Sequence, residues 1–202
     1  MAIIRKARGL GGRQPLAVLR RQQDAINDRL RKRINRTHSP ILARGVPWLS
    51  VMLLSLMPFA PLFTSAPVMP PLAFMALLAW RMLRPGMLPV WAGAPLGAFD
   101  DLYSGQPFGS AVLLWSLTML LLDLVDIRLR WRGFLQDWAL AAVMIAGYLV
   151  LATLIANLAG GAAPLRAIVP QIVLALVLHP VVTSLIAALD RLRLLPLREV
   201  GR

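Results

Sequence analysis

Long apolar segments separated by short polar or basic stretches make up most of the chain after residue 44. A helix needs about 20 mainly apolar residues to cross the hydrocarbon core of a bilayer. Six segments approach this length: 46–63, 67–83, 87–103, 108–125, 138–158 and 165–189. The pattern therefore predicts an all-α polytopic membrane protein with about six transmembrane helices.

Lysine and arginine distinguish the two sides of this expected bundle. The segment before residue 45 holds 12 of the 22 basic residues, and most others follow the second, fourth and sixth apolar segments. With six crossings, every basic residue except Arg166 falls on one side. Because basic residues accumulate in cytoplasmic loops, the sequence predicts a multi-pass protein of the bacterial inner membrane with both termini in the cytoplasm.

The same pattern divides the chain into three regions. Residues 1–44 are expected to form a basic cytoplasmic arm, 45–190 a six-helix transmembrane domain, and 191–202 a basic cytoplasmic tail. Within the arm, residues 16–34 repeat apolar positions at helical spacing, which predicts an amphipathic helix. That helix could lie on anionic membrane lipids or bind a cytoplasmic partner. Alternatively, the arm is a tail whose charge only fixes the topology.

Composition excludes several classes of protein. Hydrophobic residues make up 58% of the chain and charged residues only 15%, whereas soluble domains are about one quarter charged. The net charge of +13 is clustered between uncharged segments, so we expect no nucleic-acid partner. The absence of cysteine rules out thiolate chemistry and disulfides. No phosphate-binding loop, metal motif or nucleophile elbow is present, and we therefore expect no enzymatic activity, cofactor or metal.

The polar residues at membrane depth concentrate between residues 80 and 138. On the third segment, Gly93, Gly97 and Asp101 are four residues apart, with Asp100 and Ser104 beside them. Residues at this spacing share one helix face, and glycines there allow a second helix to approach closely. The carboxylates are thus expected to face protein rather than lipid.

Three interpretations of Asp100 and Asp101 compete: a catalytic pair, a proton or coupling-ion site, and an architectural cap. Neighbouring helical residues point about 100° apart, so the two carboxylates cannot share a proton as a catalytic dyad does. We favour the third interpretation, in which a carboxylate caps the start of the fourth helix. Pro107 would occupy the first turn of that helix, where its missing N–H has no cost.

A second group of charges is expected at the cytoplasmic ends of the second and fourth segments. Asp123 lies deeper than Asp126 and needs a basic partner, for which Arg81 and Arg84 are the candidates. Asp126 and Arg130 are four residues apart and can pair if the helix continues that far.

Two further polar residues mark helix features. Asp137 is expected to be the N-cap of the fifth helix. His179, which precedes Pro180, is interpreted as hydrogen-bonded to a backbone carbonyl that the proline leaves free, with a proton site as the alternative.

The run Gly97-x-x-x-Asp101-x-x-x-Gly105-x-x-x-Gly109, with Pro107 inside it, closes the third segment and opens the fourth. In that position it resembles the MreD family of bacterial rod shape-determining membrane proteins. The stretches RPGMLP, LLLDLVD and FLQDW are similar to one branch of that family. The five motif residues carry over with no catalytic role.

The resemblance implies a non-enzymatic component of the cell-elongation complex, which regulates cell shape and lateral peptidoglycan synthesis. The partners that it implies are an MreC-like protein, the MreB cytoskeleton, RodA and penicillin-binding-protein synthases. It also implies a fold similar to the substrate-binding subunits of energy-coupling-factor transporters. The alternative function is accordingly a vitamin-binding subunit of a membrane transporter, with a polar pocket lined by Trp91, Asp100, Asp101, Tyr103 and Gln106.

Overall fold

A computed structural model describes residues 40–57, 69–128 and 133–193, with residues 40–44 and 193 described by their backbone alone. These residues belong to one compact unit, Pro40–Leu195. The predicted amphipathic helix over 16–34 and most of the basic arm and tail lie outside them.

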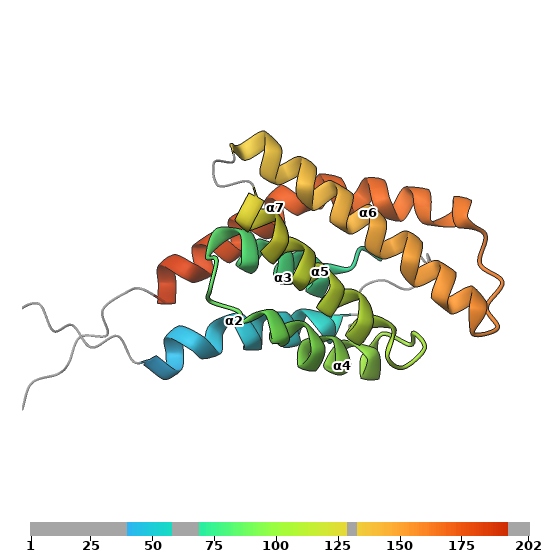
Figure 1. The fold of residues 1–202 in the computed structure, drawn as a ribbon, viewed down its shortest axis with the longest axis horizontal. Coiled ribbons are helices and arrows are strands. Elements are labelled where there is room, and N and C mark those ends of the chain that lie inside the picture. The colour runs from blue at the N-terminus through green and yellow to red at the C-terminus, as the bar shows by residue number, and fades with distance from the viewer. Residues whose placement is uncertain (1–39, 58–68, 129–132, 194–202) are drawn as a thin grey trace, which may run out of the picture. The chain divides into compact units, whose positions relative to one another are not determined.

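The described residues form helices and no strand, as the apolar pattern predicts (Figure 1). The helices are α2 (Pro40–Ser55), α3 (Leu72–Leu83), η2 (Val90–Ala92), α4 (Gly93–Tyr103), α5 (Ser110–Arg128), α6 (Phe134–Leu158), η3 (Leu165–Ile168) and α7 (Val169–Arg193). In Figure 1, α6 and α7 lie on one side, α2 and α4 on the other, and α3 and α5 between them.

Length separates two kinds of helix in this unit. Three helical segments of the described chain are long and apolar enough to cross a membrane: Ser110–Arg128, Phe134–Leu158 and Leu165–Leu192. The other α-helices are shorter, with 16 residues in α2, 12 in α3 and 11 in α4. At 1.5 Å per residue, α3 spans only about 18 Å, which is less than a typical hydrocarbon core.

Helix α3 is the centre of the packing. Every residue from Ala73 to Arg81 is buried, which is typical of a helix that is apolar on all sides and surrounded by protein. Phe74 stacks on Tyr148 of α6 at 4.2 Å and lies 6.0 Å from the Trp115 ring of α5. The Trp80 indole donates a hydrogen bond to the Ser50 hydroxyl of α2 at 2.8 Å. These contacts tie α3 to three other helices.

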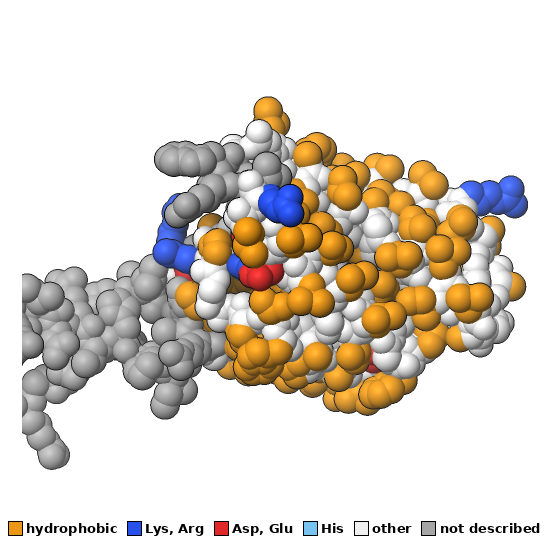
Figure 2. Space-filling view, in the orientation of Figure 1, with side chains coloured by type: hydrophobic (Ala, Val, Ile, Leu, Met, Phe, Trp, Pro, Cys, Tyr) orange, Lys and Arg blue, Asp and Glu red, His pale blue; other side chains and the backbone are white. Residues whose placement is uncertain are grey.

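The outer faces of α5, α6 and α7 are apolar. Large side chains such as Val143, Leu154 and Val177 are exposed there, and apolar side chains are spread over the whole described face in Figure 2. Water-soluble proteins rarely expose apolar surface on this scale. The exposure fits helices that face lipid.

The starts of two helices differ from the sequence prediction. The N-cap of α6 is Gly133, whose backbone N–H donates to the Gln136 side chain at 3.0 Å. The prediction of Asp137 as the N-cap is therefore wrong, because the helix begins at Phe134, three residues before Asp137, and Asp137 lies in its first turn. Likewise, Pro107 lies before α5, which begins at Ser110.

Candidate functional site: the α4–α5 corner and its neighbouring cavity

Helix α4 packs directly against the backbone of α5. A Cβ atom at Gly97 would lie 2.6 Å from the Ala111 carbonyl oxygen, and one at Gly93 would lie 2.8 Å from the Trp115 carbonyl oxygen. Real Cβ atoms essentially never approach backbone this closely. The two glycines are therefore required by the contact itself, as their four-residue spacing predicts.

One turn further along α4, Asp101 caps the start of α5. Its side chain is 5% exposed. The carboxylate accepts hydrogen bonds from the backbone N–H groups of Gly109 at 2.8 Å, Ala111 at 2.9 Å and Val112 at 3.2 Å, and from the Ser110 hydroxyl at 3.2 Å. The first N–H groups of a helix have no partner within it, and a negative charge there also opposes the helix dipole. The predicted architectural cap is confirmed by these bonds.

The turn between the two helices needs glycine at both of its ends. Gly105 has φ +69° and Gly109 has φ +96°, values in the left-handed region that other residues rarely adopt. Pro107 lies between them, and its carbonyl accepts a hydrogen bond from the Ser110 N–H at 3.0 Å. The five motif residues thus form one structural unit, which we call the α4–α5 corner: Gly97, Asp101, Gly105, Pro107 and Gly109.

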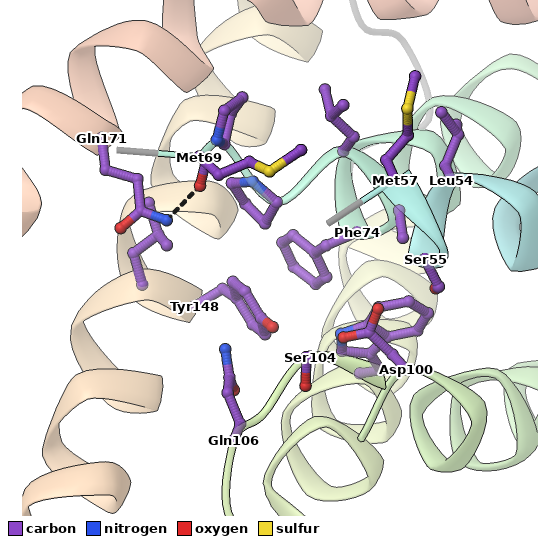
Figure 3. A pocket seen from close by; sticks show the side chains of 16 residues that line it. Leu54, Ser55, Met57, Met69, Phe74, Asp100, Ser104, Gln106, Tyr148 and Gln171 are labelled. Atoms are coloured by element: carbon purple, nitrogen blue, oxygen red, sulfur yellow. Dashed lines mark hydrogen bonds between the residues drawn. The ribbon is translucent and has the colours of Figure 1, made fainter. Parts of the chain in front are cut away.

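A cavity of about 250 Å³ lies beside this corner, among α2, α3, α4, α5, α6 and α7 (Figure 3). Its polar lining comes from distant parts of the sequence: Ser55, Asp100, Ser104, Gln106, Trp115, Tyr148 and Gln171. The Gln171 amide bonds the Met69 carbonyl across one side. Figure 3 shows Asp100, Ser104 and Gln106 along one side of the cavity, with Tyr148 and Phe74 nearby.

Of the five residues proposed from the sequence as pocket lining, the structure places two at the cavity and three elsewhere. Asp100 and Gln106 line the cavity, whereas Asp101 is directed to the start of α5. Tyr103 packs against Phe99 with ring centroids 4.9 Å apart. Trp91 is 66% exposed and contacts Trp48.

A group of ion pairs joins the ends of α3, α5 and α7 away from the Gly105 turn. Arg81 is nearly buried and contacts Asp123 at 2.9 Å and Asp126 at 3.1 Å. Arg84 contacts Asp190 at 3.0 Å. The expectation that Asp123 pairs with Arg81 or Arg84 is confirmed for Arg81.

Two expectations from the sequence have other outcomes. Asp126 pairs with Arg81, while Arg130, its expected partner, lies outside the described residues. His179 has its Nδ1 atom 3.5 Å from the Thr183 hydroxyl, and the described chain holds no partner for its Nε2 atom. The expected bond to a backbone carbonyl is thus replaced by one to a hydroxyl.

Asp190 and the α6 and α7 lining of the cavity were not among the candidates from sequence. Their partners lie about a hundred residues away or on another helix, so no local spacing marks them. Among the described residues, no group of three or more His, Asp or Glu side chains is placed to hold a metal ion.

The fold and the corner together define an all-helical membrane protein in which a glycine and aspartate motif locks two helices against each other. Residues 41–189 match the family model described as rod shape-determining protein MreD, which covers well over half of the chain. The chain belongs to the MreD family. No curated protein and no solved structure matches it, so the expected likeness to energy-coupling-factor subunits stays a prediction.

Proposed function

We propose that this rod-shape protein is a non-enzymatic scaffold of the cell-elongation complex in the bacterial inner membrane. It would bind an MreC-like protein and, with it, MreB, RodA and penicillin-binding-protein synthases, and so regulate lateral peptidoglycan synthesis. The observation that carries the proposal is the family match over residues 41–189. The partners follow from the family resemblance of the corner motif.

The contacts of Asp101, Asp123 and Asp126 support a role without catalysis. The Asp101 carboxylate is occupied by four hydrogen bonds, and Asp123 and Asp126 are paired with Arg81. Acid–base catalysis needs groups free to exchange protons with a substrate. Carboxylates that hold helices together are poorly suited to that task.

Co-purification tests the partner assignment. The full chain, solubilised in a mild detergent with the MreC-like protein of the same organism, is expected to elute with it as a stable complex. A Leu-rich single-span membrane protein expressed at the same level is the control and should elute separately. Elution of the two shape proteins as separate species would contradict the proposal.

We also propose that all six α-helices of the described unit are embedded in the membrane with both termini cytoplasmic. The ion pairs of Arg81 and Arg84 lie at the end where most basic residues are expected, and the Gly105 turn lies at the other. The shorter helices α2, α3 and α4 are accommodated by tilt, by local thinning of the bilayer or by contact with neighbouring helices.

The absence of cysteine makes this topology directly testable with single-cysteine variants. Phe108, which is 74% exposed, lies at the corner, and the exposed residue Arg128 lies at the opposite end of α5. A membrane-impermeant maleimide is expected to label Phe108→Cys in spheroplasts and Arg128→Cys only after permeabilisation. The unmodified protein is the control for background labelling. Equal labelling of both variants from outside would contradict the topology.

A further inference from the structure

The cavity beside the α4–α5 corner contains a carboxylate, Asp100, that no basic side chain of the described lining accompanies. Asp100 is 8% exposed and lines the cavity. The two arginines with ion pairs in the described chain, Arg81 and Arg84, lie at the other end of the bundle. There they pair with other aspartates and not with Asp100. Isolating a carboxylate from water is costly unless a cation or hydrogen-bond donors approach it. Asp100 therefore provides an attraction for a cation that the described chain does not satisfy.

Aromatic rings form the wall next to this carboxylate. Phe74, Trp115 and Tyr148 all line the cavity, and Phe74 contacts both of the other rings. The faces of aromatic rings attract cations, with tryptophan the strongest. The wall thus suits the same charge as Asp100 and also offers apolar contact area.

Several polar atoms at the cavity keep unused hydrogen-bonding capacity. The Ser55 hydroxyl interacts with Asp100, and the Trp115 indole and the Gln106 amide interact with Tyr148. Ser55 Oγ and Trp115 Nε1 nevertheless make no hydrogen bond of good geometry within the described chain. The Ser104 hydroxyl also lacks a partner in the described chain. Buried polar atoms are nearly always hydrogen-bonded in folded proteins. Ser55, at 2% exposure, and its neighbours indicate a site built for a polar guest.

We propose that this cavity binds a small organic cation, with a primary ammonium group paired to Asp100 and an apolar body against Phe74, Met57 and Met69, which all line the cavity. The described residues of the lining include no lysine, arginine or histidine, which disfavours an anion. Among the described residues, no three His, Cys, Asp or Glu side chains come together to hold a metal ion, so we assign an ammonium group rather than a metal ion to Asp100. The volume of about 250 Å³ is slightly below the usual range of ligand pockets, roughly 300–1,000 Å³. A group the size of an amino acid fits better than a large vitamin.

The ammonium group could come from a free amine or from the ethanolamine headgroup of a membrane lipid. Either source would occupy the same carboxylate. This site does not depend on the elongation-complex role, since neither the cap nor the proposed partners take part in it.

Calorimetric titration of the full chain in detergent tests the charge preference. The probes are phenethylamine, its neutral analogue 2-phenylethanol and the anion 3-phenylpropionate. Hydrogen bonds to charged groups contribute about 1.5–3 kcal/mol, so the amine is expected to bind roughly 10- to 100-fold more tightly than the alcohol. The anion is expected not to bind. No binding of the amine, or equal affinity for amine and alcohol, would overturn the proposal without any variant being needed.

Variants then locate the site. Asp100→Asn keeps the shape of the side chain and is expected to reduce amine affinity to that of the alcohol. Asp123→Asn makes the same change in the Arg81 ion pairs and should leave amine binding unchanged. Thermal unfolding verifies that both variants are folded. An Asp100→Asn protein that binds the amine as tightly as the unmodified chain would overturn the assignment.

Lipid nanodiscs distinguish the two sources of the ammonium group. Weaker apparent amine binding in phosphatidylethanolamine than in phosphatidylcholine discs, which are also zwitterionic but lack a primary ammonium group, supports the site and identifies the lipid headgroup as its occupant. Equal amine affinity in the two lipids supports the site and identifies a free amine.

Discussion

Gly97→Ala is expected to lower the thermal unfolding midpoint of the purified protein clearly, and Gly97→Leu to prevent native packing of α4 on α5. Even a single methyl group at Gly97 would lie 2.6 Å from the Ala111 carbonyl oxygen. The obstacle is backbone, which cannot move aside as a flexible side chain would. Overpacking of this kind costs about 1–3 kcal/mol, and the larger leucine should cost more. Cells that depend on Gly97→Leu are expected to lose rod shape.

Gly147→Ala is the matched control for this substitution. Gly147 lies inside α6, and a Cβ atom there would meet nothing within 4 Å apart from the adjacent backbone of its own helix. Removing a helical glycine in open space is neutral or stabilising, by up to about 1 kcal/mol. Unfolding of both alanine variants is followed by tryptophan fluorescence in the same detergent. Equal midpoints for Gly97→Ala and Gly147→Ala would show that close packing at the corner contributes nothing.

The sequence predicted the order of the helices better than their lengths. Each of the six apolar segments overlaps one α-helix of the described unit, but in the second segment, 67–83, only Leu72–Leu83 is helical. Pro70 and Pro71 immediately precede that helix and Pro89 precedes η2. Hydropathy measures apolar composition, whereas proline decides where helical hydrogen bonding can begin. Apolar content alone therefore overestimated the lengths of α3 and α4.

The candidate site also has one part that the sequence predicted and one part that it did not. The Asp101 cap could be predicted because donor and acceptor lie within about ten residues of each other, and the glycines around them mark a turn. The cavity could not, because Tyr148 and Gln171 reach it from helices far along the chain. Tyr148 has no polar neighbour in sequence that indicates a site, and its place in the cavity is visible only in the folded structure, where it stacks on Phe74. Long-range pairing of this kind has no local signal in a single sequence.

Asp101→Ala is expected to destabilise the protein by about 3 kcal/mol or more, while leaving membrane insertion intact. The change removes the acceptor of three backbone N–H groups at the start of α5, those of Gly109, Ala111 and Val112. Each buried donor left without a partner costs about 1–3 kcal/mol, which together exceeds the cost of losing an exposed helix cap, about 0.5–2 kcal/mol. Insertion is preserved because the apolar length of α5, α6 and α7 is unchanged. Asp101→Asn keeps one acceptor oxygen in place of two, so its stability should lie between those of the unmodified protein and Asp101→Ala.

Asp100→Ala separates the cap from a general effect of removing charge in α4. The two aspartates are neighbours and similarly buried, yet the backbone bonds at the start of α5 all go to Asp101. Asp100→Ala is therefore expected to change the unfolding midpoint little, because no helix terminus loses its partner, and to change amine binding instead. Thermal unfolding in detergent and the recovery of an MreC-like partner are measured for both variants. If the two substitutions lowered stability equally, the hydrogen bonds to α5 could not be what makes Asp101 necessary, and the corner would depend on the glycine contact alone.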